Sequence, residues 1–243
     1  MSRDAFLARV RQAAEMGRAY RVHLQPVPET IVRVGVQEDL VLRFAAEVDA
    51  VGGQSYLVSD AAGVQAALSR LVEESGATSA LCWQYELLDR VGLAEFLKTR
   101  GIARHDYDSL ATLSSDRQRQ VVFGCDIGIT SCDLAIAETG TLVMCSRPGQ
   151  ERVASLLPPY YVTIVERRQI VADLVDAVAA LGIGRMTKDP ASMTNNIPNP
   201  QSPIPNLPSN VTLITGPSKT GDIELQLTTG VHGPGRWRVI VLQ

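Results

Sequence analysis

The chain has 243 residues, of which 45% are hydrophobic and 20% are charged, proportions typical of a globular protein with a substantial core. Its net charge of −3 offers no basic field to duplex nucleic acid, and the 5% aromatic content argues against a base-stacking platform. Charges throughout segment 3–19 exclude the apolar core of an export signal, and no run approaches the roughly 18 apolar residues of a membrane span. We therefore expect a cytoplasmic protein that binds no nucleic acid and spans no membrane.

Helix and strand patterns alternate along the first half of the chain. Apolar residues recur at helical spacing within 6–14, 40–51 and 64–72. Between these segments, 55–59 and 79–83 are short continuous apolar runs, which is typical of strands buried on both faces of a sheet. The first half therefore predicts strands separated by helices.

The second half continues this alternation and adds a hairpin. Segments 133–137 and 141–145 are apolar runs joined by three residues that include a glycine, which predicts a β-hairpin. A strand at 160–165 precedes a helix that we expect to contain Ile170, Val171, Leu174, Val175 and Val178 and to end at Gly182. The last predicted strands cover 211–215 and 237–242.

Together these elements predict an α/β fold with an open, mostly parallel sheet and helices on both faces, and the hairpin makes the sheet mixed. We expect residues 1–35 to form an N-terminal helix and linker, and 36–243 to form the α/β domain. Segment 187–210 holds six of the thirteen prolines. This composition predicts a long loop without regular secondary structure, which we call the predicted excursion.

Three glycine-bearing segments follow or adjoin predicted strands: Ala-Glu-Thr-Gly-Thr at 137–141, Gly-Pro-Ser-Lys-Thr-Gly-Asp-Ile-Glu at 216–224 and Gly-Val-His-Gly-Pro-Gly at 230–235. Open α/β sheets bind ligands in loops at strand ends, and glycine allows close approach of the backbone. The predicted ligand-binding residues of these segments are Thr139, Gly140, Thr141, Gly216, Ser218, Lys219, Thr220, Asp222, Glu224 and Gly233.

The segment 216–224 is not a P-loop, because Asp222 and Ile223 stand where lysine and a hydroxyl residue are required. A helix beginning near Gly221, capped by Ser218 or Thr220, would still form an anion site to which Lys219 adds charge. Asp222 and Glu224 are open to two interpretations. They are either ordinary acidic partners of the helix dipole or ligands for hydroxyls, amines or a hard cation.

Glu138 and His232 are the candidate catalytic residues. Glu138 emerges where a buried strand ends, and partial burial would suit a carboxylate to acid–base or nucleophilic chemistry; alternatively, it accepts turn amides from Gly140 and Thr141. His232 is the histidine flanked by glycines and could transfer protons or bind an anion, or it is a solvated loop side chain. Asp126 and Thr130 are better explained by capping than by a pocket.

The four cysteines, Cys82, Cys125, Cys132 and Cys145, have no Cys-x-x-Cys spacing and fit no standard zinc or iron–sulfur set. We expect them to be buried thiols. The sequence identifies no cofactor.

Four segments carry a resemblance to a known family: Gly-Ile-Thr at 128–130 and the three segments at 137–141, 216–224 and 230–234. In this order and setting they resemble the LUD-domain family, specifically its lactate-utilisation protein C (YkgG-like) members, over most of residues 30–243. The resemblance implies a fold similar to the NagB/RpiA/CoA-transferase group. It also implies a part in oxidising L-lactate to pyruvate beside two partner proteins that carry iron–sulfur clusters.

Two functional hypotheses follow from the residues and the resemblance. In the first, the chain is a non-cluster subunit of a lactate-utilisation system that binds a small anionic ligand. In the second, it is a self-sufficient transferase acting on acyl-CoA or a phosphorylated substrate, because Glu138 resembles the glutamate of the Glu-x-Gly turn in class I CoA transferases.

Overall fold

The structure is a computed structural model that describes residues 39–181, 210–220 and 228–243, with Pro208 and, near the start, Arg3, 5–9 and Gln12. The chain divides into two compact units, Met1–Arg33 and Val34–Gln243. In the first unit, residues 5–9 are helical. The predicted excursion at 187–210 lies outside the described residues, apart from its last positions.

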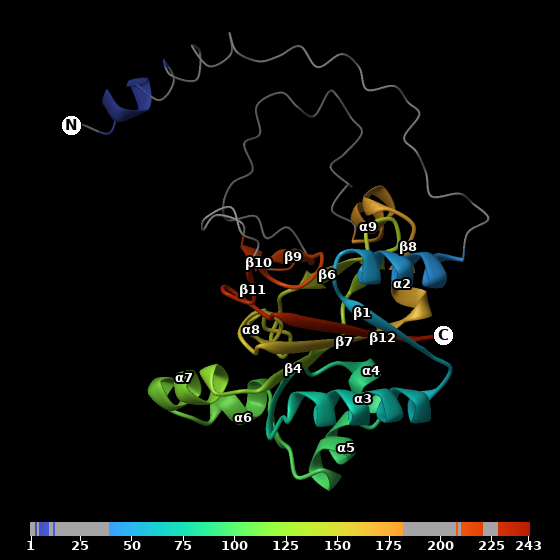
Figure 1. The fold of residues 1–243 in the computed structure, drawn as a ribbon. Helices are drawn as coiled ribbons and strands as arrows, with labels where there is room; N and C mark the ends of the chain where they lie inside the picture. Colours follow the sequence, from blue (N-terminus) through green and yellow to red (C-terminus); the bar gives the residue numbers. More distant parts are fainter. Residues whose placement is uncertain are drawn as a thin grey trace. The chain divides into compact units, whose positions relative to one another are not determined.

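A six-stranded sheet forms the centre of the second unit (Figure 1). All of its pairings are parallel. In spatial order its strands are β1 (Gln54–Val58), β12 (Arg236–Leu242), β7 (Tyr160–Glu166), β4 (Ile127–Thr130), β2 (Ser79–Cys82) and β3 (Ala103–His105). Every residue of β4 is buried, which explains why the central strands read as continuous rather than alternating apolar runs.

A second, four-stranded sheet holds the predicted hairpin. Its order is β8 (Ile170–Val171), β5 (Leu134–Ile136), β6 (Thr141–Cys145) and β9 (Val211–Ile214). β6 pairs antiparallel with both β5 and β9, whereas β8 pairs parallel with β5. The predicted hairpin therefore lies in this sheet and not in the central one, whose pairings are all parallel.

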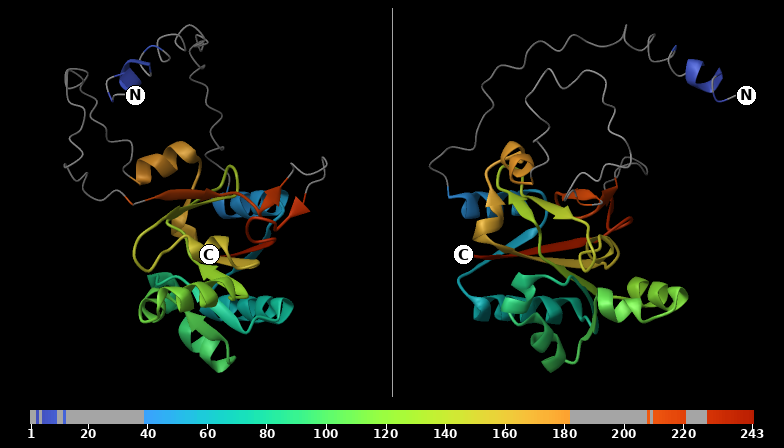
Figure 2. Two further views of the ribbon diagram at one scale, coloured as in Figure 1. Left: turned by 90° about the vertical axis from the view of Figure 1, so that its left-hand side faces the viewer. Right: turned by 180° about the vertical axis from the view of Figure 1, so that it is seen from behind.

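Helices and the second sheet cover the two faces of the central sheet. Figures 1 and 2 show α3 (Ala61–Ser75), α4 (Glu86–Arg90) and α5 (Leu93–Thr99) on one face, and α2 (Leu40–Ala50) with the second sheet on the other. Buried Phe44 and Val48 of α2 and Leu68 and Leu71 of α3 pack into the core. The predicted α/β fold class is confirmed.

The helix expected to contain Ile170 and Val171 begins later than predicted. These two residues pair with Ala135 and Ile136 as β8, after a 3-10 turn at Arg167–Gln169. The helix α9 covers Leu174–Ala180, and the Asp173 side chain caps it by accepting from the backbone N–H of Asp176. The apolar spacing continues across this boundary, so periodicity alone could not locate it.

The described part of the unit also contains three short helices, α6 (Tyr107–Ala111), α7 (Ser115–Phe123) and α8 (Val153–Leu156). The helices α6 and α7 connect β3 to β4 and contribute no buried residue. In the described ranges, no helix is long and apolar enough to cross a bilayer.

Candidate functional site

Two of the three predicted loops meet in a cavity of about 250 Å³, which we call the loop cavity. Gly216 and Ser218 come from one loop, and His232 and Gly233 from the other. The remaining lining residues are Ser155, Leu156, Tyr161, Thr212, Leu213, Ile214, Thr215, Pro217, Pro234 and Trp237.

Backbone hydrogen bonds hold the two loops together. The N–H of Ser218 donates to the carbonyl of Pro234 at 2.9 Å, and the N–H of Gly230 donates to the carbonyl of Ser218 at 2.9 Å. A Cβ on Gly233 would lie 3.3 Å from the Cβ of Ser218, so glycine permits this close approach.

Open α/β sheets usually bind ligands at the carboxyl ends of their parallel strands. The loop cavity lies instead at the opposite edge of the central sheet. The loop with His232 precedes β12, and Ser155 and Leu156 precede β7. The cavity therefore borders the amino ends of these parallel strands and the carboxyl end of β9 in the second sheet.

The helix predicted to begin near Gly221, with Ser218 or Thr220 as its cap, lies outside the described residues, which end at Thr220 and resume at Thr228. Lys219 and Thr220 form the strand β10, which pairs antiparallel with β11 (Thr228–Thr229). The carboxylates Asp222 and Glu224 lie outside the described residues.

Lys219 is engaged with the end of α2. Its Nζ donates to the carbonyl of Val51 at 2.6 Å, and Val51 is the residue that follows α2. A cation at a helix C-terminus is stabilised by the helix dipole. The described contacts thus give Lys219 a structural partner.

The turn 137–141 approaches the loop cavity through hydroxyl groups. The Oγ1 of Thr139 lies 2.6 Å from that of Thr141, which lies 2.7 Å from the Oγ1 of Thr215 in the cavity wall. Glu138 is not among the lining residues; its backbone N–H donates to the carbonyl of Ala172 at 3.0 Å. The turn therefore reaches the cavity by its threonines.

Gly140 packs its backbone directly against α2. Its φ is +61°, and a Cβ there would lie 2.6 Å from the backbone nitrogen of Val48 and 2.7 Å from the carbonyl carbon of Glu47. Glycine is required here both for the left-handed conformation and for the contact.

We expect Gly140→Ala to lower the free energy of unfolding by about 2 kcal/mol, because the turn must lift away from α2. Urea unfolding of both proteins measures this change. Gly101→Ala, at a φ of +68° with nothing within 4 Å of an added Cβ, is the matched control and should cost only about 1 kcal/mol from backbone strain. Equal stability of Gly140→Ala and the unmodified protein would contradict the packing role.

The four cysteines are free and buried, as expected from the sequence. Burial raises the pKa of the Cys82 thiol to about 12 and that of Cys125 to about 11. Among the residues that the structure describes, no three His, Cys, Asp or Glu side chains form a group suited to a metal ion.

The LUD domain matches residues 41–242 of the chain. The chain belongs to the LUD-domain family. The family resemblance inferred from the four segments is therefore confirmed.

Several relatives of this LUD-domain chain are named lactate utilization protein C. The protein of that name from Shouchella clausii is 28% identical over 96% of this chain and 94% of its own length. That from Halalkalibacterium halodurans is 30% identical over 74% of this chain and 69% of its own length. The crystal structure of a DUF162 family protein from Deinococcus radiodurans shares the fold, with a TM-score of 0.51 and 20% identity over 84% of this chain and 97% of that one.

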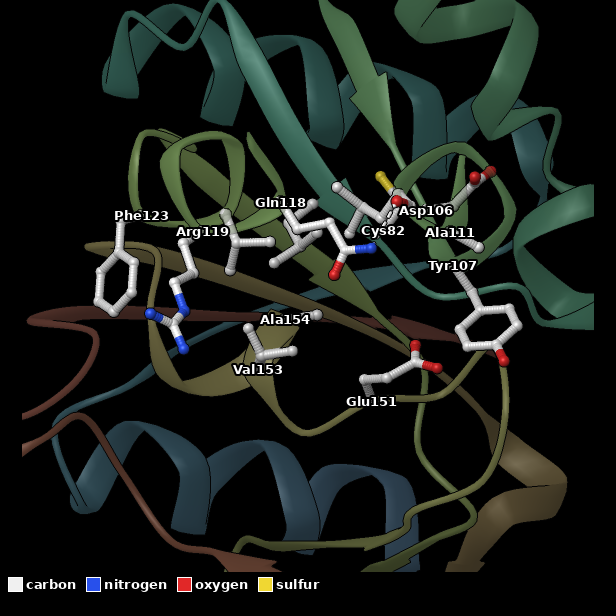
Figure 3. Close-up of a pocket in the computed structure, with 13 residues that line it drawn as sticks. Cys82, Asp106, Tyr107, Ala111, Gln118, Arg119, Phe123, Glu151, Val153 and Ala154 are labelled. Atoms are coloured by element: carbon white, nitrogen blue, oxygen red, sulfur yellow. Dashed lines mark hydrogen bonds between the residues drawn. The ribbon is translucent and has the colours of Figure 1, made fainter. Parts of the chain in front are cut away.

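The LUD domain also contains a larger cavity that the sequence did not predict (Figure 3). Its volume is about 540 Å³, and it lies between α6, α7, the end of β2 and the start of α8. Sequence reasoning missed it because segment 107–123 carries no glycine motif. The signal present in the sequence is the end of the buried strand at Cys82, since such strand ends commonly border ligands.

Proposed function

We propose that this chain is a subunit of an L-lactate utilisation system and that it binds a small anion, such as a hydroxy acid, in the loop cavity. The observation that carries the proposal is the name lactate utilization protein C, borne by relatives that align with nearly the whole chain. Iron–sulfur partner proteins would carry the electrons, and this chain would contribute the anion site.

The lining of the loop cavity suits a small hydroxy acid. Ser218 and Thr215 offer hydroxyls and His232 an imidazole, which can donate to a carboxylate or exchange a proton with it. The indole N–H of buried Trp237, another lining residue, has no hydrogen-bond partner in the part of the chain that the structure describes. Because an unsatisfied buried donor costs about 1–3 kcal/mol, an acceptor supplied by a ligand would stabilise this wall.

The transferase alternative has less support from the geometry. It requires Glu138 to reach a substrate, and Glu138 does not line the loop cavity. The nearest connection is the hydroxyl chain of Thr139, Thr141 and Thr215. We therefore favour the binding subunit over a nucleophilic enzyme.

Growth on L-lactate tests the proposed function. A strain that lacks the gene and any other lactate dehydrogenase should fail to grow on L-lactate and grow normally on pyruvate, and the intact gene should restore growth. The His232→Ala variant should restore growth at a markedly lower rate, because it removes the imidazole from the loop cavity.

His105→Ala is the matched control, because His105 ends β3 and does not line the loop cavity. It should restore growth fully. Unimpaired growth of the deletion strain would overturn the role in lactate utilisation. Full rescue by His232→Ala would overturn the assignment of the loop cavity.

A further inference from the structure

The larger cavity lies at the carboxyl end of β2, beside a topological switch point of the central sheet. Leu81 and Cys82, at the end of β2, form part of its wall. The chain leaving β2 enters α4 on one face of the sheet, whereas the chain leaving the neighbouring strand β4 enters the second sheet on the other face (Figure 1). Open α/β sheets bind small ligands in the crevice between two such strands.

The walls of this cavity are largely apolar. Leu110 and Val122 line it from α6 and α7, and Val153 and Ala154 line it from α8. Phe123, with 73% of its surface exposed, stands at one end beside Arg119 (Figure 3). A volume of about 540 Å³ is within the usual range of sites for small organic ligands.

Gln118 presents a fixed hydrogen-bond acceptor to the cavity. Its amide nitrogen donates to the carbonyls of Leu110 at 3.0 Å and Leu113 at 3.1 Å. Because both partners are acceptors, the nitrogen must face them, and the carbonyl oxygen is left turned toward Ala154 (Figure 3). A ligand donor could therefore bind at Gln118 without rearrangement of the side chain.

Opposite charges stand at the two ends of the cavity (Figure 3). Arg119 forms no ion pair or hydrogen bond with any residue of the described ranges, so its guanidinium is available to an anion. Glu151 lies toward the other end, where its Oε1 accepts from the backbone N–H of Gly149 at 2.9 Å. This carboxylate retains a free oxygen for ligand donors and disfavours a second anionic group.

We propose that this cavity binds a nucleoside monophosphate. The phosphate pairs with Arg119, the flat base lies over the apolar floor, and N–H or hydroxyl donors reach Gln118 and Glu151. A fatty acid would supply the anion and the apolar body but no donors. Glu151 and Gln118 would then lose water without a partner, which is costly. The proposal is independent of the loop cavity and of lactate.

The binding of the four standard ribonucleoside monophosphates, measured by isothermal titration calorimetry, tests the proposal. At least one should bind, and its parent nucleoside and octanoate should bind at least about tenfold more weakly, because each lacks one of the two polar anchors. Arg119→Gln should raise the dissociation constant about tenfold. Arg117→Gln is the matched control on α7, because Arg117 does not line the cavity and bonds instead to Gln120; it should change nothing.

A second pair of variants separates filling of the cavity from loss of charge. Ala111→Trp places an indole in the cavity from an exposed position on α6 and should abolish binding, whereas Thr112→Trp, at the next residue, should not. Hydrogen exchange at 107–123 should slow when the nucleotide binds, since α6 and α7 have no buried residue of their own. The proposal is overturned if no monophosphate binds or if octanoate binds as tightly as the best monophosphate. It is also overturned if Arg119→Gln and Ala111→Trp leave the affinity for the monophosphate unchanged.

Discussion

Gly128→Ala should lower the free energy of unfolding by about 4 kcal/mol or more, enough to leave much of the protein unfolded. Gly128 is buried in the middle of β4. A Cβ built there would lie 1.9 Å from the backbone carbonyl oxygen of Ala154, in α8. Because the obstructing atom is backbone, rotation of a side chain cannot relieve the overlap, and α8 must move off the sheet.

The consequences of this displacement extend to both cavities. Val153 and Ala154 of α8 line the larger cavity, and Ser155 and Leu156 line the loop cavity. Any Gly128→Ala protein that remains folded should therefore bind ligands more weakly at both sites. The four residues of α8 thus contribute to the walls of both cavities, so a displacement of this helix should affect the two cavities together.

Urea unfolding followed by circular dichroism measures the effect of Gly128→Ala. Gly76→Ala is the control, because Gly76 ends α3 at a φ of +65° with nothing within 4 Å of an added Cβ. That substitution should cost about 1 kcal/mol from backbone strain alone. Similar losses in the two variants would contradict the close packing of α8 on β4.

The elements that could be predicted best are those marked by a local sequence pattern, such as a continuous apolar run or a short connection that contains glycine. The continuous apolar runs became β1 and β2, and the glycine-containing connection became the β5–β6 hairpin. Burial on both faces was wrong for β1, which is an edge strand with exposed and half-buried residues. The spacing of Ile170 and Val171 matches that of Leu174 and Val175 and predicts a helix, although pairing with β5 makes these two residues a strand. Long-range pairing of this kind is decided by tertiary contacts, which local spacing does not record.

The candidate site was predictable in part, because two of its loops carry glycines that mark them in the sequence. Glycines at 216 and 233 marked two loops that do approach one another in the loop cavity. The loop with Gly233 leads into β12, and the loop with Gly216 follows β9 of the second sheet. These positions depend on strand order, which a single sequence does not specify. Arg119 and Glu151 carry no motif, and only the fold brings α7 and the start of α8 to the same cavity.

The sequence favours a capping role for Asp126, and the structure gives this residue a related role in joining β2 to β4. Its Oδ2 accepts four hydrogen bonds, from the N–H and hydroxyl of Thr78 at 2.9 and 3.0 Å and from those of Ser79 at 3.0 and 2.8 Å. Partial burial would raise the pKa of Asp126, but these hydrogen bonds outweigh it and hold the pKa below its usual value.

We expect Asp126→Ala to lower the free energy of unfolding by about 3 kcal/mol at pH 7, because four donors lose a charged acceptor. The loss should depend on pH. Since the pKa is lower in the folded state, the ionised carboxylate stabilises the fold fully above the unfolded pKa of about 3.9. This stabilisation decreases as the pH falls below that value and is lost as the pH falls through the folded pKa.

The urea midpoints of the unmodified and Asp126→Ala proteins should therefore differ more at pH 7 than at pH 3, because only the part of the loss that comes from the charge depends on pH. Asp116→Ala, in the exposed first turn of α7, is the control and should change stability by less than about 0.5 kcal/mol at either pH. A difference at Asp126 that stays constant with pH would show that contacts of the side chain other than those of its charge join the strands. A smaller difference at pH 3 would show that the ionised carboxylate helps to hold β2 beside β4, and the end of β2 forms part of the wall of the larger cavity.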